Sequence, residues 1–271
     1  MSEITLNKLP KTLQELQAMP QAGLTNPEEV AALTVASLAL YPENPSETEK
    51  MLDFLLFGYF GCDGSDGADT MRNRAAHRAY LDLARTVSYS SSTSQLAEKL
   101  KKRSSEYEKK EAETFIKKKE ALVDSVCERL YPLPTGDFDA WHQEKCKEIC
   151  RMMDDSGLLG EPFTCGQAQK WVNMTLKYLW LMDLLPEEIK EESLHVPIDS
   201  FILQRLSKQV SDVTGSGETY CYKHMAWSAI TEYTDYKDLQ AEIRKITPNP
   251  IRWEGEAWIA VAKMRAAKKN A

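Results

Sequence analysis

An arginine, an asparagine and a histidine lie within six residues of one another at Arg72, Asn73 and His77, in the segment RNRAAH. Histidine can act as a general base, and arginine can stabilise negative charge that develops on a phosphate. Metal-independent RNA cleavage needs both, because a base activates the 2′-hydroxyl and a cation stabilises the phosphorus centre. Asn73 precedes His77 by one helical turn, so its side chain can fix the imidazole tautomer. These three residues are the candidate catalytic set.

This spacing resembles the motif of the HEPN ribonucleases, small helical-bundle enzymes of bacterial toxin and phage-defence systems. The resemblance implies a base at His77 and a phosphate-binding cation at Arg72. We expect Ala76, Tyr80, Leu83 and Val87 to form the buried stripe of this helix, with Asn73 inside the stripe and Arg72 and His77 on its margins. The alternative is a basic helix edge beside a core stripe.

A second set of reactive residues, His142, Cys146 and Cys150, recurs at four-residue intervals. A histidine and a cysteine on one helix face can bind zinc. However, Phe138, Ile149 and Met153 share this face, and no second pair of ligands follows elsewhere. We therefore expect buried core cysteines, no metal and no cofactor.

The segment Phe163–Pro186 predicts an apolar central helix over about residues 164–185, capped by Thr164. Cys165 at its start has no evident histidine partner, so a catalytic thiol is not expected. The helix also carries a polar strip of candidate binding residues: Gln169, Lys170, Asn173 and Lys177. This strip either faces a partner or ligand, or forms hydrogen bonds with neighbouring helices.

The composition describes a folded, acidic protein. The 271 residues are 42% hydrophobic, and 34 basic against 41 acidic residues give a net charge of -7. This charge argues against nonspecific binding to nucleic acid or anionic lipid. Six scattered cysteines and an N-terminus without a secretory signal favour the cytoplasm, and the longest apolar run is too short to span a membrane. The sequence also lacks the phosphate-binding, dinucleotide-binding and serine-nucleophile glycine motifs.

Helix-forming patterns extend over nearly the whole sequence, so we predict an all-α multi-helix bundle. Asn26-Pro27 and Asn44-Pro45 begin two helices, ending near Leu40 and Phe57. A loop rich in glycine and aspartate at 61–69 then separates an N-terminal helical segment, 1–60, from a main helical domain, 69–271.

The second long element is an amphipathic helix over about residues 95–130. Its apolar positions recur at spacings of four, seven or eight: Leu96, Leu100, Tyr107, Phe115, Leu122, Val126 and Leu130. Interleaved lysines and glutamates indicate a solvated face rather than a nucleic-acid site. The apolar positions must pack on the rest of the protein or on a second copy, and we expect dimerisation.

Two longer segments are similar to uncharacterised bacterial proteins. The segments FDAWHQEKC at 138 and GQAQKWVNMTLKYL at 166, with those that follow to about residue 246, resemble a family of helical proteins. Residues 24–55 resemble an N-terminal segment of other such proteins. Neither resemblance implies an activity.

We therefore predict a cytoplasmic bacterial protein that acts by binding a protein partner or by self-association, without a membrane. The alternative function is a HEPN-type metal-independent ribonuclease, and RNA is an expected partner only under that alternative.

Overall fold

The computed structural model describes residues 56–62, 66–101, 104–214 and 221–269. The protein divides into two compact units, Met1–Ser65 and Asp66–Ala271. The described residues of the first unit include one π-helical turn, η2 (Leu56–Phe60). The helices predicted at 26–40 and 44–57 therefore lie almost wholly outside the described residues.

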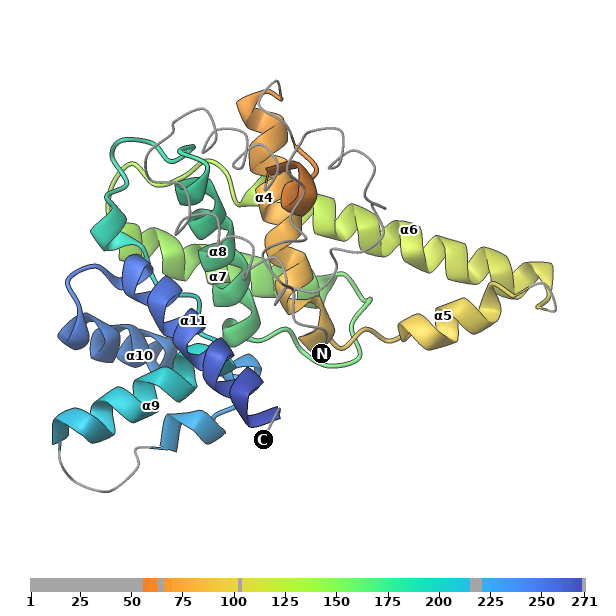
Figure 1. Cartoon of the computed structure of the whole chain (residues 1–271). Helices are drawn as coiled ribbons and strands as arrows, with labels where there is room; N and C mark the ends of the chain where they lie inside the picture. The colour runs from red at the N-terminus through yellow and green to blue at the C-terminus, as the bar shows by residue number, and fades with distance from the viewer. Residues whose placement is uncertain (1–55, 63–65, 102–103, 215–220, 270–271) are drawn as a thin grey trace, which may run out of the picture. The chain divides into compact units, whose positions relative to one another are not determined.

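The described part of the second unit is built from helices, and the predicted all-α class is confirmed (Figure 1). The α-helices are α4 (Ala68–Leu83), α5 (Thr93–Lys99), α6 (Glu106–Arg129), α7 (Phe138–Asp155), α8 (Cys165–Leu181), α9 (Ser200–Thr214), α10 (Tyr233–Ile246) and α11 (Pro250–Lys269). Short 3-10 turns are η3 (Ala84–Thr86), η4 (Glu191–Ser193), η5 (Cys221–His224) and η6 (Trp227–Ala229). Extended pairing within the described ranges is limited to an isolated bridge between Tyr89 and Leu159.

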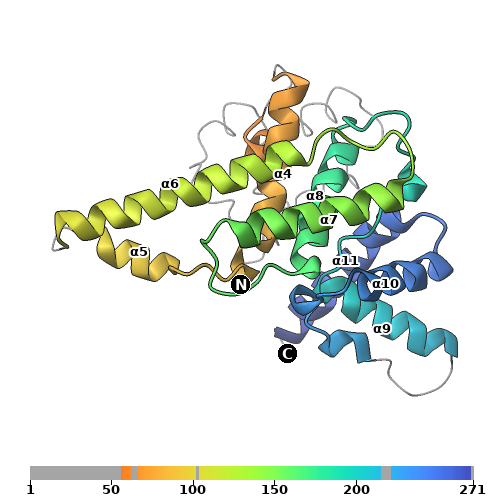
Figure 2. The ribbon, with the colours of Figure 1, turned by 180° about the vertical axis from the view of Figure 1, so that it is seen from behind.

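Helix α8 lies at the centre of the second unit and contacts α4, α7, α10 and η6 (Figures 1 and 2). Thr164 caps it as predicted, in a reciprocal capping box with Gln167. Fourteen of its seventeen residues are buried. The helix ends at Leu181, before the predicted 185, because Asp183 adopts a positive φ of 55° that ends the helical turn.

Trp171 is the largest fully buried side chain of this helix. Its ring lies 4.9 Å from that of Tyr80 on α4, and its indole N–H donates to the Ala76 carbonyl at 3.0 Å. The α4–α8 contact therefore combines apolar burial with a satisfied indole donor.

Gly166 allows the η6 segment to approach the first turn of α8. A Cβ atom at this position would lie 1.9 Å from the Trp227 carbonyl oxygen. The Gly166 N–H also donates to the Ile230 carbonyl at 2.8 Å. Only glycine fits this approach without a backbone shift.

The predicted long helix is two helices, which is a correction to its starting point. Ser105 accepts from the Glu108 N–H, and the Glu108 carboxylate accepts from the Ser105 N–H, so a capping box starts α6 at Glu106. The shorter α5 has its own capping box at Ser92. The two helices form a projecting hairpin, the α5–α6 arm (Figures 1 and 2).

The last three helices form their own apolar cluster against the start of α8. Its fully buried members include Val196, Ile202, Leu206, Tyr236 and Ile243. Asp137 caps α7, and its carboxylate accepts from the Ala140 N–H at 3.2 Å. These contacts place α7, α8 and α10 around the polar interior described next.

Candidate functional site

The candidate catalytic residues lie on α4, which packs on α6. Arg72 pairs with Asp69, with 3.2 Å between Nη1 and Oδ1. The His77 imidazole pairs with Asp124 of α6, with 3.1 Å between Nε2 and Oδ1. Asn73 is exposed, so the prediction that it lies in the buried stripe is wrong.

The buried face of α4 is turned relative to the predicted stripe. It is formed by Ala75, Ala76, Ala79, Tyr80 and Leu83. Ala75 and Ala79 are buried on this side, and Asn73 faces solvent. Val87 lies beyond the end of the helix.

The residue that contacts and can orient the His77 imidazole is Asp124 and not the predicted Asn73. When Nε2 of His77 carries the hydrogen donated to Asp124, Nδ1 is the nitrogen that can accept a proton. The His77 side chain is 35% exposed and that of Arg72 is 36% exposed. The pair can therefore meet a solvent-borne molecule, while the catalytic role of Arg72, Asn73 and His77 stays a prediction.

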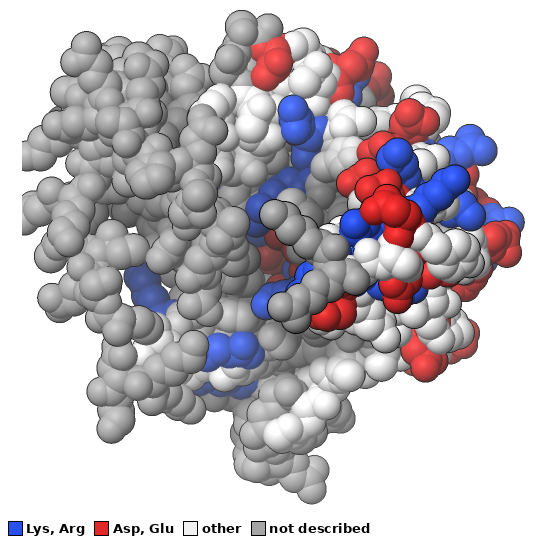
Figure 3. Space-filling model, turned by 90° about the vertical axis from the view of Figure 1, so that its right-hand side faces the viewer, with Lys and Arg blue, Asp and Glu red and all other residues white. Residues whose placement is uncertain are grey.

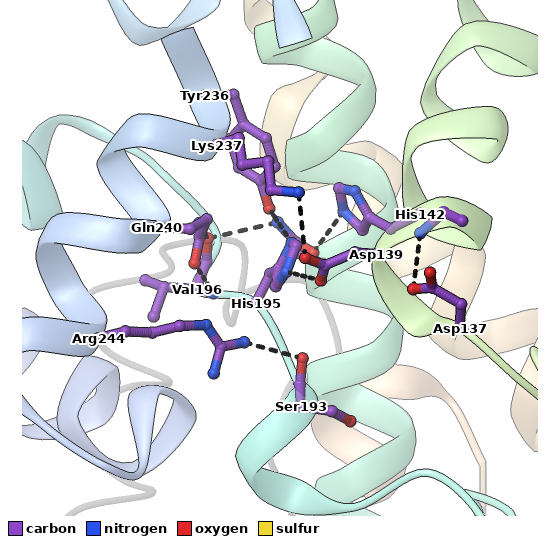
Figure 4. Close-up of polar contacts among 12 residues, drawn as sticks. Asp137, Asp139, His142, Ser193, His195, Val196, Tyr236, Lys237, Gln240 and Arg244 are labelled. Carbon is purple, nitrogen blue, oxygen red and sulfur yellow. Dashed lines mark hydrogen bonds and ion pairs between the residues drawn. The ribbon is translucent and has the colours of Figure 1, made fainter. Parts of the chain in front are cut away.

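A second polar cluster lies in the interior between α7, α8, α10 and the segment 194–198 (Figure 4). We call it the His–Tyr network, and its members are Tyr233, His142, Asn173, Tyr236, His195 and Asp139. In its first half, Nδ1 of His142 lies 2.9 Å from the Tyr233 hydroxyl, and Nε2 lies 2.9 Å from Oδ1 of Asn173.

The second half of the His–Tyr network leads to the surface. Nδ2 of Asn173 donates to the Tyr236 hydroxyl oxygen at 2.8 Å. That hydroxyl lies 2.8 Å from Nδ1 of His195, and Nε2 of His195 lies 2.9 Å from Oδ1 of Asp139. His142, Asn173 and Tyr236 are fully buried, whereas the Asp139 side chain is 46% exposed.

Two glutamines attach the segment 194–198 to this cluster. The Gln240 amide makes paired hydrogen bonds with the backbone of Val196, at 2.9 and 2.7 Å. Gln169 of α8 accepts from the Ile198 N–H at 3.2 Å and donates to the Ile198 carbonyl at 3.0 Å. The backbone of an irregular buried segment is thus satisfied by side chains.

Burial controls the ionisation of the two interior histidines. Desolvation lowers the pKa of His142 well below its ordinary value, and a positive charge on His195 would lower it further. Desolvation also lowers the pKa of His195, although Asp139 opposes that effect. The hydrogen bond from His195 is the main cause that lowers the pKa of Asp139. At neutral pH the network therefore holds two neutral imidazoles and one carboxylate.

The candidate binding residues of α8 are engaged within the protein. Gln169 and Asn173 are 0% exposed and bond to each other at 3.0 Å. Lys170 pairs with Asp199 at 2.8 Å, and Lys177 pairs with Glu254 at 2.5 Å. These contacts match the alternative in which the strip bonds to neighbouring segments, and ligand binding by Gln169, Lys170, Asn173 and Lys177 stays a prediction.

Of the cysteines near the network, Cys146 and Cys165 are buried, whereas Cys150 is half-buried, which corrects the prediction that it is a core residue. Cys146 is 1% exposed, with its sulfur 3.7 Å from Nδ1 of His142. Burial raises the pKa of Cys150 to about 12 and that of Cys165 to about 11, so the thiolate is disfavoured despite the helix start at Cys165. Across the described ranges, no three His, Cys, Asp or Glu side chains are grouped so that they could hold a metal ion.

A shallow groove of about 410 Å³ runs along the α5–α6 arm. Its apolar lining is Leu96, Tyr107, Ala112, Phe115 and Leu158. Its charged lining is Lys99, Lys110, Lys118 and Glu111, and Lys99 pairs with Glu111 at 2.7 Å. Figure 3, which faces the projecting end of the arm, shows acidic and basic side chains intermixed with uncharged surface.

Sequence reasoning missed most of the His–Tyr network. Asp139, His195, Tyr233 and Tyr236 come from three separate segments, and His195 lies 56 residues from Asp139 along the sequence. No fixed spacing joins them. The usable signal was the histidine on the apolar face of α7 at His142, because a buried imidazole needs hydrogen-bond partners from elsewhere.

One family model matches part of the sequence. Residues 8–127 match a family described as a domain of unknown function (DUF6935). The match includes the N-terminal segment 24–55, α4, α5 and most of α6, and it ends before the His–Tyr network. The resemblance of residues 138–246 to a bacterial family is not tested by this match and stays a prediction.

No curated protein and no solved structure matches the sequence. Among the described residues, no helix combines the length and the hydrophobicity needed to cross a bilayer.

Proposed function

We propose that the protein acts by binding another protein, and that the α5–α6 arm provides the binding surface. The observation that carries this proposal is the exposure of apolar side chains around the joint between the two arm helices. Tyr107 is 76% exposed and Leu100 is 40% exposed. Exposed aromatic and aliphatic side chains beside a groove are typical of protein contact sites.

The charges of the groove define the chemistry of the partner. Three lysines and one glutamate line it, and the pairing of Lys99 with Glu111 leaves Lys110 and Lys118 to face a ligand. Within the part of the protein that the structure describes, these two lysines form no ion pair. The partner is therefore an acidic segment whose apolar residues contact Leu96, Tyr107 and Phe115.

The test is fluorescence anisotropy with two labelled amphipathic peptides of about 18 residues, each with leucines at helical spacing. One carries glutamates on its polar face and the other carries lysines. We expect only the acidic peptide to bind. The double substitution Lys110→Glu and Lys118→Glu should weaken that binding about tenfold or more, since each tenfold change corresponds to 1.4 kcal/mol.

The matched control is Lys147→Glu with Lys190→Glu, which changes the net charge equally at exposed positions outside the arm. This variant should bind the acidic peptide like the wild type. If both peptides bind equally, or if neither binds, the proposal of an acidic partner is contradicted. If sedimentation shows a dimer and Tyr107→Ser dissociates it, the partner of the arm is a second copy of the protein and not an acidic segment.

The second candidate function is the metal-independent ribonuclease, and the pairing of His77 with Asp124 favours it. A solvent-accessible imidazole that is oriented by a carboxylate can act as a general base. The test is cleavage of single-stranded RNA in chelator by wild type, His77→Gln and the control His224→Gln, which changes an exposed histidine elsewhere. Loss of cleavage in His77→Gln alone supports the ribonuclease, whereas no cleavage by the wild type excludes it under these conditions.

A further inference from the structure

Two of the four histidines lie inside one hydrogen-bonded cluster, the His–Tyr network. Buried histidines bonded to each other through neutral groups are sensitive to proton number, because each ring nitrogen must be either a donor or an acceptor. The direction of each hydrogen bond in the network therefore depends on how many protons the two histidine rings carry.

Backbone groups fix these directions, since a backbone N–H always donates and a carbonyl always accepts. The Ile198 N–H donates to Oε1 of Gln169, which identifies that atom as the oxygen. Oε1 of Gln169 also accepts from Nδ2 of Asn173, so Oδ1 of Asn173 is the atom that faces His142. Nε2 of His142 must then carry a hydrogen, and its Nδ1 accepts from the Tyr233 hydroxyl.

The same reasoning continues to the surface. Tyr236 accepts from Nδ2 of Asn173, so its own hydroxyl hydrogen is directed at Nδ1 of His195. Nε2 of His195 then donates to the Asp139 carboxylate. All five bonds run in one direction, from Tyr233 to Asp139, and both imidazoles carry their single hydrogen on Nε2.

A second proton on either imidazole conflicts with this order. On His195 it would occupy Nδ1, and the hydroxyl hydrogen of Tyr236 would lose its acceptor. This leaves a buried donor unsatisfied, which is costly inside a protein. On His142 the second proton would oppose the Tyr233 hydroxyl, which would have to turn its hydrogen to the more distant Asp139 carbonyl oxygen, 3.5 Å away.

The groups that face the two rings come from each element packed around them. They are Asp139, His142 and Cys146 of α7, Asn173 and Cys165 of α8, and Tyr233, Tyr236, Lys237 and Arg244 of α10. Lys237 and Arg244 disfavour a charge on His195, and Asp139 alone favours it. Burial lowers the pKa of both histidines, so protonation accompanies opening of the interior.

We propose that the His–Tyr network is a proton-sensitive latch, which holds α10 and the segment 194–198 against α7 and α8 at neutral pH and releases them in mild acid. The network joins α10 to α7 and α8 at Tyr233 and Tyr236, and Gln240 of α10 binds the segment 194–198 beside it. The apolar contacts of α8 with α4 are independent of these bonds. Protonation of the network should therefore lower the stability of α10 and leave that of α6 nearly unchanged. It does not depend on the proposed partner of the arm.

The test is hydrogen exchange of the whole protein, read by mass spectrometry for α10 and α6 at about pH 7.5 and 5.5 and corrected for intrinsic exchange. An exposed histidine titrates near 6.5, so each network histidine that must become protonated on opening should lower the protection of α10 about tenfold at pH 5.5. Protection of α6 should change much less. Equal changes in α10 and α6 would overturn the proposal.

His195→Gln keeps a donor towards Asp139 but cannot titrate, and it should remove about one tenfold step from the pH effect on α10. His142→Gln should remove the other, and the exposed control His224→Gln should leave the effect unchanged. A pH effect that persists in the double variant His142→Gln with His195→Gln contradicts the latch.

If these variants fold poorly, a measurement on the wild-type protein can test the derived hydrogen-bond order. Nitrogen NMR of the histidine rings at about pH 7.5 should show both buried rings as neutral Nε2–H tautomers. A hydrogen on Nδ1 of either buried ring would contradict the derived order.

Discussion

The interior around α8 and the surface of the α5–α6 arm are both rich in polar residues, but they use them in opposite ways. In the interior, Asn173 and Gln169 are fully buried and bonded to named partners. On the arm, Lys110 and Glu113 face solvent. Polar residues are therefore bonded within the protein in one region and exposed to solvent in the other.

The difference lies in what neighbouring segments provide. The segment 194–198 has irregular backbone that must be satisfied after burial, and side chains of α8 and α10 satisfy it. The arm helices satisfy their own backbones through regular helix bonds and capping boxes. Polar side chains of the arm such as Lys110 and Lys118 consequently face solvent.

The largest expected difference between the two regions concerns their aromatic residues. Trp171→Ala should lower the free energy of unfolding by about 3–5 kcal/mol, because it leaves a cavity between α4 and α8. Tyr107→Ala, at a 76% exposed site, should change it by no more than about 0.5 kcal/mol. Urea unfolding of both variants measures this comparison, and similar losses would show that the arm joint is part of the core.

Two asparagines provide a second, smaller comparison. Asn173→Ala removes a partner from His142, Tyr236 and Gln169, and an unsatisfied buried group costs about 1–3 kcal/mol. Asn73→Ala on α4 should stay within about 0.5 kcal/mol of the wild type because Asn73 is exposed. Thermal or urea unfolding checks both. A neutral Asn173→Ala would show that the interior rearranges to satisfy these groups.

The features that could be predicted from the sequence are those that depend on residues close together in the chain. Helix periodicity and the Thr164 cap located α8. The start of α6 was missed although Ser105 and Glu108 have the spacing of a capping box, because the heptad-like apolar pattern runs through the break. The His–Tyr network could not be predicted, since its hydrogen bonds join positions up to 91 residues apart.

The pH dependence of global stability should also separate the two regions. A histidine whose folded pKa is lowered contributes stability above its unfolded value of about 6.5 and loses it as pH falls below that value. Each of His142 and His195 should therefore reduce the unfolding free energy by about 1.4 kcal/mol for each pH unit below 6.5, down to its folded pKa. The lowered pKa of Asp139 adds a further loss, which begins below about pH 4.

Urea titrations between about pH 7.5 and 5 measure this slope. His142→Gln with His195→Gln should flatten it between pH 6.5 and 5, whereas His224→Gln should not. A wild-type slope of zero in this range would mean that neither buried ring must titrate on unfolding.

The smallest expected effect lies on the arm and connects its stability to recognition. Ser105→Ala removes the oxygen that accepts from the Glu108 N–H, which should cost about 1 kcal/mol and loosen the first turn of α6. Because that turn carries Tyr107 beside the groove, binding of the acidic peptide should weaken as well. Ser105→Thr should restore both properties, since the threonine hydroxyl also caps a helix and can still donate to the Glu108 carboxylate. Unfolding and anisotropy measured on the three proteins test the link, and restored stability without restored binding would place the binding surface away from the arm joint.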